Sequence, residues 1–278
     1  MHKPSSRSSK SNERSKRLKS RRKSHSPSRE NKSRTVWLYG HHAAMAALRN
    51  PSRICNELLL TPEASARLTE TLNSLPKGRI PPTHVVRATD IEAVLSQGAV
   101  HQGIALKAER LPGVTLEEAC VPRDDDRNVV VVLDHVTDPR NVGAVLRSAA
   151  AFGARALLVT EPHVPVESGS LAKAASGALD TLPYLRVANL ARALDRLAGL
   201  GYWRIGLAAG ADSSLSETDL SDHVVLVLGA EGSGLRRLTA EKCDQLARLP
   251  TRAGFPDLNV SNAAAVALYE VMRSLTAR

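Results

Sequence analysis

The chain has 278 residues, of which 42% are hydrophobic, and it carries 38 Lys or Arg against 28 Asp or Glu, a formal net charge of +10. This length fits one or two folded domains, and the apolar content is sufficient to build their cores. No run of about 18 apolar residues occurs, so no membrane-spanning helix is expected.

The positive charge is concentrated at the start of the chain. The first 34 residues hold 13 Lys or Arg and two acidic residues, so the remainder carries 25 basic and 26 acidic residues. A Ser-, Lys- and Arg-rich segment without aromatic residues cannot bury enough apolar surface to offset its ordering entropy. We expect residues 1–34 to be a disordered tail that attracts phosphate groups electrostatically, or one that only keeps the protein soluble. A targeting peptide is disfavoured because no apolar segment follows.

Residues 35–110 alternate between helical and strand-like patterns, which predicts a small α/β domain. The expected helices are Gly40–Leu48, Pro62–Leu75 and one that Asp90 caps and that runs to Gln97; the expected strands are Ile54–Leu60, Val85–Val86 and Gly103–Ala108. His41, His42 and His101 lack metal-ligand spacing, and we expect them to be structural histidines with satisfied hydrogen bonds.

Residues 111–127 are the expected linker, because they contain two prolines, a glycine and the acidic run Asp124–Asp126. A short helix is expected within it at Leu116–Cys120. The three cysteines, Cys55, Cys120 and Cys243, are far apart and form no CxxC pair. This pattern indicates neither a metal site nor a disulfide framework, and it fits a reducing cytoplasm.

Residues 128–278 predict a second α/β domain, because continuous apolar runs typical of parallel strands buried on both faces alternate with helical segments. The expected strands are Asn128–Leu133, Ala156–Thr160, Trp203–Ala208 and His223–Leu228; the expected helices are Pro139–Phe152, Val166–Ala178, Leu190–Leu200 and Val260–Leu275. Ligands of such sheets bind beyond the carboxyl ends of the strands.

Three segments of this second domain fall at those ends. Asp134–Arg147 (DHVTDPRNVGAVLR) begins a helix at Asp138-Pro139, with Asn141 in its first turn and Arg147 about two turns in. Taken alone, it fits a well-capped helix with an exposed arginine.

The second segment, Gly229–Gly234 (GAEGSG), follows an apolar strand directly and places the carboxylate of Glu231 in a flexible loop. Its glycine order matches neither a dinucleotide fingerprint nor a P-loop, which disfavours a dinucleotide oxidoreductase. The third segment is Leu249–Ala263, in which Leu249-Pro250 ends a strand and Asp257–Asn262 opens an Ala-rich helix.

In this order, the three segments resemble the motifs of the SpoU-type (TrmH-like) branch of the SPOUT RNA methyltransferases. The resemblance implies S-adenosylmethionine-dependent methylation of a ribose 2′-hydroxyl, a C-terminal trefoil knot and a homodimer whose active site draws on both subunits. It assigns catalytic positions to Asn141, Arg147, Glu231 and Asn259, and cofactor-binding positions to Gly229, Leu249 and Leu258. Asp257 departs from the family, which usually has Ser there.

The family proposal makes the arginine activate the 2′-hydroxyl, but a guanidinium is effectively always protonated and accepts a proton poorly. We therefore expect Arg147 to bind the phosphate beside the target and to hold the 2′-oxygen in line with the donor methyl. A charge-assisted contact to the developing alkoxide would add to this effect.

The first domain also carries a resemblance. Tyr39–Ala43 (YGHHA) and Val100–Ala105 (VHQGIA) are similar to the substrate-binding domain of SpoU ribosomal RNA enzymes, which resembles L30e/L7Ae-type RNA binders. It implies a guanosine of large-subunit (23S) ribosomal RNA as the target. Transfer RNA methylation, ribosomal antibiotic resistance and a non-catalytic ribosome-assembly factor remain alternatives, although four intact catalytic positions argue against the last.

Deleting residues 1–34 is expected to weaken RNA binding most at low salt and to leave cofactor binding intact, because phosphate contacts are salt-dependent. The measurement is the dissociation constant for RNA against salt concentration, for the full and shortened chains. An unchanged salt slope would remove the electrostatic role of the tail.

Overall fold

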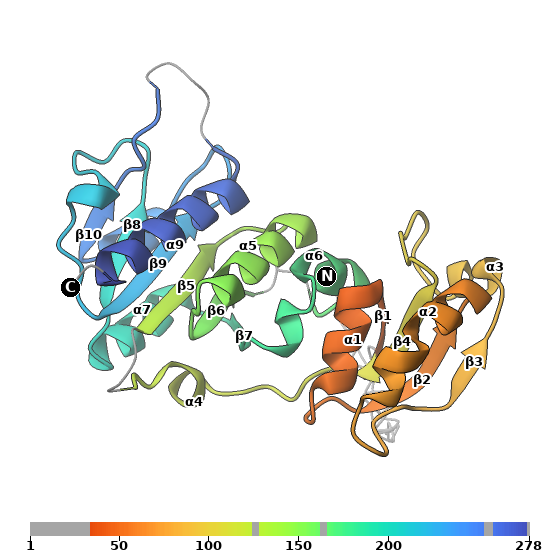
Figure 1. The fold of residues 1–278 in the computed structure, drawn as a ribbon. Helices are drawn as coiled ribbons and strands as arrows, with labels where there is room; N and C mark the ends of the chain where they lie inside the picture. The colour runs from red at the N-terminus through yellow and green to blue at the C-terminus, as the bar shows by residue number, and fades with distance from the viewer. Residues whose placement is uncertain (1–33, 124–127, 162–165, 253–257, 277–278) are drawn as a thin grey trace, which may run out of the picture. The chain divides into compact units, whose positions relative to one another are not determined.

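The structure is a computed structural model that describes residues 34–123, 128–161, 166–252 and 258–276 (Figure 1). The expected disordered tail, apart from Arg34, lies outside these residues, as does Asp257. In the described part of the chain, no helix is both long and apolar enough to cross a membrane.

The first part of the chain forms a four-stranded sheet of order β1-β4-β2-β3. β4 pairs antiparallel with β1 and β2, and β2 pairs parallel with β3. Its strands are β1 (Thr35–Tyr39), β2 (Cys55–Leu60), β3 (Thr83–Val85) and β4 (Ile104–Glu109), and its helices are α1 (His41–Arg49), α2 (Pro62–Asn73) and α3 (Ala88–Glu92).

Local sequence explains where α2 begins, whereas the observed α3 differs from the prediction. α2 begins where the Thr61 side chain accepts a hydrogen bond from the backbone N–H of Ala64, 3.3 Å away. The prediction that Asp90 caps a helix running to Gln97 was wrong. Arg87 occupies the cap position of α3, and the Asp90 carboxylate accepts the backbone N–H of Arg87 from inside the helix at 3.1 Å. The strand β1 was not predicted.

The second part is a six-stranded sheet of order β10-β8-β9-β5-β6-β7, and its neighbouring strands pair in parallel, which confirms the predicted sheet. The strands are β5 (Asn128–Asp134), β6 (Ala156–Thr160), β7 (Tyr184–Val187), β8 (Trp203–Leu207), β9 (His223–Gly229) and β10 (Gln245–Ala247). The helical segments are α4 (Leu116–Cys120), α5 (Pro139–Ala151), α6 (Gly169–Ala175), η1 (Ala178–Asp180), α7 (Leu190–Gly199), η2 (Leu215–Glu217), α8 (Arg237–Glu241) and α9 (Val260–Thr276).

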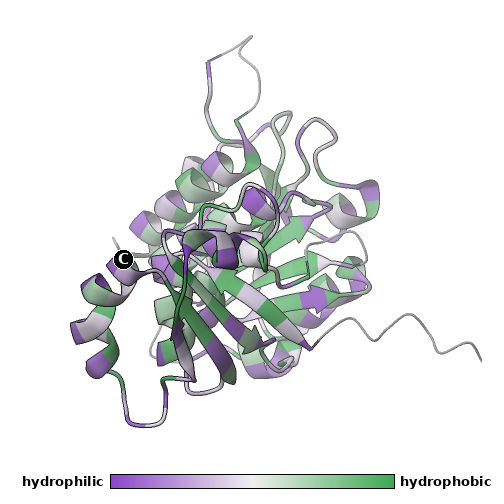
Figure 2. Cartoon of the chain, turned by 90° about the vertical axis from the view of Figure 1, so that its right-hand side faces the viewer, coloured by the Kyte–Doolittle hydropathy of each residue, from purple (hydrophilic) through white to green (hydrophobic). Residues whose placement is uncertain are grey.

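Helices cover both faces of this sheet, and β5 shows how. Val129, Val131 and Leu133 pack on the side of α5 and α9, whereas Val130 and Val132 pack on the side of α4 and α7. Every residue of β5 is buried, as its continuous apolar run predicted. Figure 2 shows green, hydrophobic segments along strands of the sheets and helices on which purple and green segments alternate.

Three elements differ from the predictions at the edges. β7 and α8 were not predicted, since both are short and β7 carries the exposed Arg186 in its middle. The predicted helix Val166–Ala178 is confined to Gly169–Ala175, because Ser176 and Gly177 adopt positive φ angles of 52° and 97° and end it. The short helix predicted in the linker is present as α4, with Thr115 and Glu118 forming a capping box.

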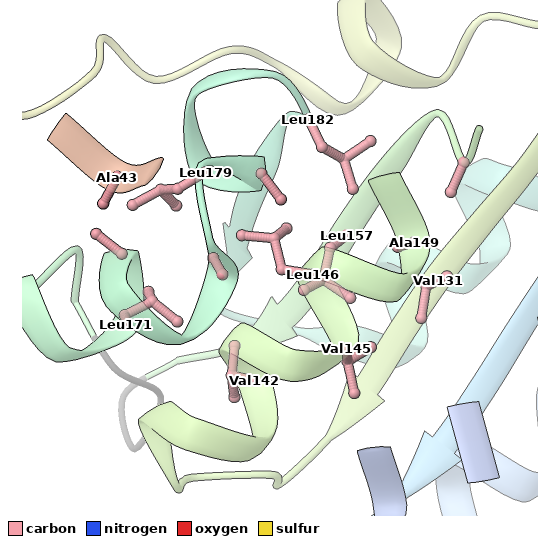
Figure 3. Packing of buried hydrophobic residues seen from close by; sticks show 14 of the residues in the cluster. Ala43, Val131, Val142, Val145, Leu146, Ala149, Leu157, Leu171, Leu179 and Leu182 are labelled. Atoms are coloured by element: carbon pink, nitrogen blue, oxygen red, sulfur yellow. The ribbon is translucent and has the colours of Figure 1, made fainter. Parts of the chain in front are cut away.

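The two sheets share one hydrophobic core. A single cluster of buried side chains runs from Leu38 and Ala43 in the first part to Leu146 and Leu179 in the second. Figure 3 shows Ala43 of α1 beside Leu179 and Leu171. The approach of the backbones is close, since a Cβ on Gly169 would lie 2.4 Å from the carbonyl oxygen of Trp37.

A buried ion cluster joins the same two parts. The Arg53 side chain is fully buried; its Nε donates to Asp180 Oδ1 at 2.8 Å, and its Nη1 contacts the Glu167 carboxylate. Asn50 Nδ2 also donates to Asp180 Oδ1, at 3.1 Å, and the Leu111 N–H donates to Glu167 Oε2 at 3.1 Å. Arg53 of the first part of the chain is thus held by two carboxylates of the second part.

Arg53→Met is expected to lower the free energy of unfolding by about 3–5 kcal/mol, because it leaves two carboxylates without their buried cation. Urea denaturation followed by circular dichroism measures the change. Arg87→Met is the matched control, since Arg87 makes an exposed pair with Asp90 and its loss should leave the midpoint unchanged. A loss for Arg53→Met no larger than the control's would mean that apolar packing alone joins the two parts.

Candidate active site

The pairing of β5 with β9 brings the first two sequence segments together. The strands are parallel and in a register that pairs Asp134 with Gly229, so both reach the carboxyl edge of the sheet at the same level. The chain continues from Asp134 into α5 and from Gly229 into the glycine loop. Residues about 95 positions apart along the chain therefore begin the two sides of one site.

The glycine loop folds back on its own start. The Gly234 N–H donates to the carbonyl of Ala230 at 2.9 Å, and a Cβ on Gly229 would lie 2.1 Å from the Gly234 carbonyl carbon. Gly232 and Gly234 have positive φ angles of 79° and 64°. This turn therefore requires glycine at all three positions.

A buried carboxylate that the sequence analysis missed fastens this loop to β5. Asp134 is fully buried and accepts the backbone N–H of Arg236 at 3.0 Å and its Nε at 2.7 Å. An acidic residue ending an otherwise apolar strand was the available signal, because a buried carboxylate requires a partner. The contact fixes where the chain leaves the loop.

Three of the four predicted catalytic residues form one hydrogen-bonded cluster. Glu231 Oε1 accepts Asn141 Nδ2 at 3.0 Å and Asn259 Nδ2 at 2.7 Å, and Asn259 Nδ2 lies 3.1 Å from Asn141 Oδ1. The backbone N–H of Val260 also points to Glu231 Oε1, at 3.5 Å. One residue from each of the three segments thus meets at one carboxylate oxygen.

Helix starts hold the two amides of this cluster in place. Asp138 caps α5 by accepting the N–H of Arg140 at 2.8 Å, which sets Asn141 in the first turn. Asn259 precedes α9, and its Oδ1 accepts the N–H of Ser261 at 2.9 Å. The capping residues expected at these helix starts are therefore present, and one of them, Asn259, also contacts Glu231.

A cavity of about 540 Å³ opens beside the cluster. The three predicted cofactor-binding residues, Gly229, Leu249 and Leu258, line it together with Glu231 and Asn259. Thr251 and Ala263 of the third segment line it as well, whereas the contribution of Leu207, Ala208 and Ala209, at the end of β8, was not predicted. The prediction that Leu249-Pro250 ends a strand was wrong, because β10 ends at Ala247 and Leu249 lies in the loop beyond it.

Arg147 does not join the other three predicted catalytic residues. Arg147 lies six positions after Asn141 on α5. This spacing places the two residues roughly 9 Å apart along the helix axis and about 120° apart around it. Arg147 is exposed and lines a separate hollow of about 390 Å³, together with residues of α1, the end of α6 and η1.

Thiol and metal chemistry have little support at this cavity. Cys55, Cys120 and Cys243 are free, and burial raises the pKa of Cys120 and Cys243 to about 12, so neither is a thiolate near neutral pH. Among the residues that the structure describes, no group of three or more His, Cys, Asp or Glu is placed to hold a metal ion.

Comparison with known proteins matches both parts of the chain to one group of enzymes. Residues 128–269 match the family model described as SpoU rRNA Methylase family, and residues 37–113 match the one described as RNA 2'-O ribose methyltransferase substrate binding. The 23S rRNA (guanosine-2'-O-)-methyltransferase RlmB of Pseudomonas aeruginosa is 38% identical over 242 residues, covering 86% of this chain and 96% of the relative. RlmB of Escherichia coli is 36% identical over 242 residues, covering 85% of this chain and 97% of the relative.

Solved structures share the fold. The SpoU methyltransferase AviRb from Streptomyces viridochromogenes, in complex with AdoMet, matches with a TM-score of 0.73 at 23% identity, over 87% of this chain and 91% of that chain. A structure described as an RNA 2'-O ribose methyltransferase matches with a TM-score of 0.70 at 26% identity, over 88% and 91%. The predicted α/β class, with a parallel-sheet domain after a smaller N-terminal domain, is confirmed.

Gly229→Ala is expected to destabilise the protein by roughly 1–3 kcal/mol, because the added Cβ overlaps the Gly234 backbone and forces the loop to move. Thermal denaturation measures the loss. Gly210→Ala is the control, since no atom lies within 4 Å of a Cβ at that position. Equal melting temperatures for the two variants would show that the loop yields without cost.

Proposed function

We propose that this chain, which belongs to the SpoU rRNA methylase family and is an RNA 2′-O-ribose methyltransferase, methylates a guanosine of 23S ribosomal RNA with S-adenosylmethionine. The observation that carries the proposal is the Asn141–Glu231–Asn259 cluster at the rim of the cavity. The similarity to the RlmB relatives along nearly their whole length supports the guanosine target.

The cavity fits S-adenosylmethionine. Leu249 and Leu258 provide apolar surface for an adenine ring, and the glycine loop exposes backbone groups at Gly229 that polar parts of the cofactor can approach closely. The Glu231 carboxylate faces the same space and suits a cationic sulfonium. The cofactor supplies a methyl group that the ribose 2′-oxygen accepts as the S–C bond breaks, and the hydroxyl proton leaves to water.

The hydrogen-bonded cluster has a positioning role in this proposal. Three donors converge on Glu231 Oε1, so the carboxylate is held in one orientation before any substrate arrives. Asn141 has one further N–H and Glu231 a second oxygen with which to hold a ribose. Fixed polar groups of this kind lower the barrier because they need no reorganisation during the reaction.

Arg147 binds the phosphate beside the target ribose. Within the described residues, no carboxylate lies within ion-pair distance of its guanidinium, which leaves the fork open to an anion. Within one copy of the chain, Arg147 lies apart from Glu231. We therefore place the active site between two copies, with Arg147 supplied by the second.

A homodimer of this kind would use α9. Val266 and Tyr269 lie three positions apart on this helix and are 48% and 56% accessible, so they present adjacent apolar surface to solvent. Tyr269 packs edge-on to Phe152 at the end of α5, with ring centroids 6.4 Å apart. This surface thus extends from α9 to the helix that carries Asn141 and Arg147.

The proposed division of labour follows the two sheets. Residues 35–110 bind the RNA substrate, residues 111–127 link the domains and residues 128–278 carry the methyltransferase site. The proposed compartment is the cytoplasm, since ribosomal RNA enzymes act where the ribosome is assembled and the three thiols are free.

Purified protein incubated with methyl-labelled S-adenosylmethionine is expected to label unmodified large-subunit ribosomal RNA at a 2′-O-methylguanosine, and not small-subunit or transfer RNA. Arg147→Ala should lower turnover by about 100-fold or more, in the range of lost electrostatic stabilisation of a transition state. Arg147→Lys should lower it nearly as far, since lysine lacks the two-pronged donor geometry.

Label in transfer RNA would move the target to that class. Cofactor binding without label in any RNA would indicate an assembled particle as substrate, and loss of both would support the non-catalytic alternative. Near-normal turnover of Arg147→Lys would show that charge alone is required at this position.

A further inference from the structure

Two hollows outside the cofactor cavity share a lining residue, His41. One, of about 540 Å³, lies in the first domain and is lined by Arg67, His101 and Gln102 among others. The second is the hollow of about 390 Å³ that contains Arg147, and Arg49 lines it too. His41, at the first position of α1, therefore stands where the two hollows meet.

Positive charge is concentrated along this path. Arg49, Arg67, Arg147 and Lys173 have no carboxylate within ion-pair distance in the described part of the chain, although Glu63 also lines the first hollow. Burial lowers the pKa of His41, and the neighbouring side chains of His42, Arg67, Arg49 and Lys173 lower it further. Cations placed this close together repel one another, and a bound anion relieves that repulsion.

Gln102 forms hydrogen bonds that hold the cationic side chains of Lys173 and Arg67 in place. The Gln102 side-chain oxygen accepts Lys173 Nζ at 2.7 Å and the backbone N–H of His41 at 3.3 Å, while the Gln102 backbone carbonyl accepts Arg67 Nη2 at 3.2 Å. Its backbone has a positive φ of 58°, which is uncommon for a residue other than glycine. Such a conformation persists only where its surroundings hold it.

His41 also has an unused polar atom. Its Nδ1 is buried and has no hydrogen-bond partner among the described residues, so the expectation of a satisfied structural histidine was wrong for His41. For His101 the expectation was correct, since its Nδ1 accepts the Gly103 N–H at 3.1 Å. A buried nitrogen without a partner costs free energy unless a bound group meets it.

We propose that the two hollows form one cationic groove, carrying the cations Arg49, Arg67, Arg147 and Lys173 with His41 between them, that binds the RNA strand adjoining the target nucleotide. The inference rests on the proposed function and deepens it. Single strands are held by rows of cations for the backbone together with ring surfaces for bases, and the groove offers both through its arginines and the paired rings of His41 and His42.

The groove is separate from the methyl-donor cavity. The two share no lining residue, so variants in the groove can be tested without disturbing the cofactor. Arg49 and Arg67 serve best, because both are exposed at the groove and neither belongs to the proposed catalytic set.

The test compares the full-length double variant Arg49→Glu/Arg67→Glu with Lys77→Glu/Arg192→Glu. The control has the same change of charge at two exposed sites that line neither hollow. The dissociation constant for a large-subunit rRNA transcript is measured across a salt series, with S-adenosylmethionine binding as the check on folding. For the groove variant we expect at least tenfold weaker RNA binding at low salt and a salt slope reduced by about 1.4, for two lost single-strand phosphate contacts.

Steady-state kinetics add a second readout. The KM for RNA should rise in the groove variant while kcat stays within about twofold of the wild type, since the cofactor site is intact. If both variants bind RNA alike, net charge alone matters and the groove is overturned while the methyltransferase function stands. If the wild type neither binds S-adenosylmethionine nor transfers a methyl group, the proposed function fails, and the RNA-binding comparison still decides the groove.

Discussion

The register between β5 and β9 is the constraint on which the site depends. Both strands are buried on both faces, so a slip of one residue would exchange one apolar face for another and hydrophobic burial alone would not prevent it. Polar contacts at the strand ends specify the pairing instead. The contact of the Asp134 carboxylate with Arg236 links the end of β5 to the loop after β9, and it is satisfied in the alignment in which Asn141 and Glu231 meet.

What could be predicted from the sequence follows from how local each signal is. The strands β5 and β9 and the helices α5 and α9 were placed to within a residue or two, because their apolar runs and caps lie within each segment. Edge elements such as β7 carry too few residues to show a period. The family resemblance assigned Asn141, Glu231 and Asn259 to one site, but their hydrogen bonds come from the structure. The role of Asp134 was not predicted, because its partner lies 102 positions away.

The position of Arg147 could not be predicted from spacing. Six residues along a helix turn a side chain away from its predecessor, and whether that side chain reaches the same site depends on what packs beside it. In this chain α1 of the first domain packs there, which makes Arg147 part of an interdomain surface. The nearly neutral folded body can therefore hold a polyanion by a few unpaired cations placed together, without a broad basic face.

The buried Arg53 cluster joins the two domains. This contact sets the distance between the proposed RNA-binding surface and the methyl donor, and that distance bears on which nucleotide can react. An RNA-binding surface on a hinge would let many riboses reach the methyl donor. Where the two domains keep a constant arrangement, the length of strand between the anchored nucleotide and the reactive ribose is constant as well. With the proposed groove as the anchor, that length would limit which nucleotide can reach the methyl donor, in addition to any recognition of the guanine base.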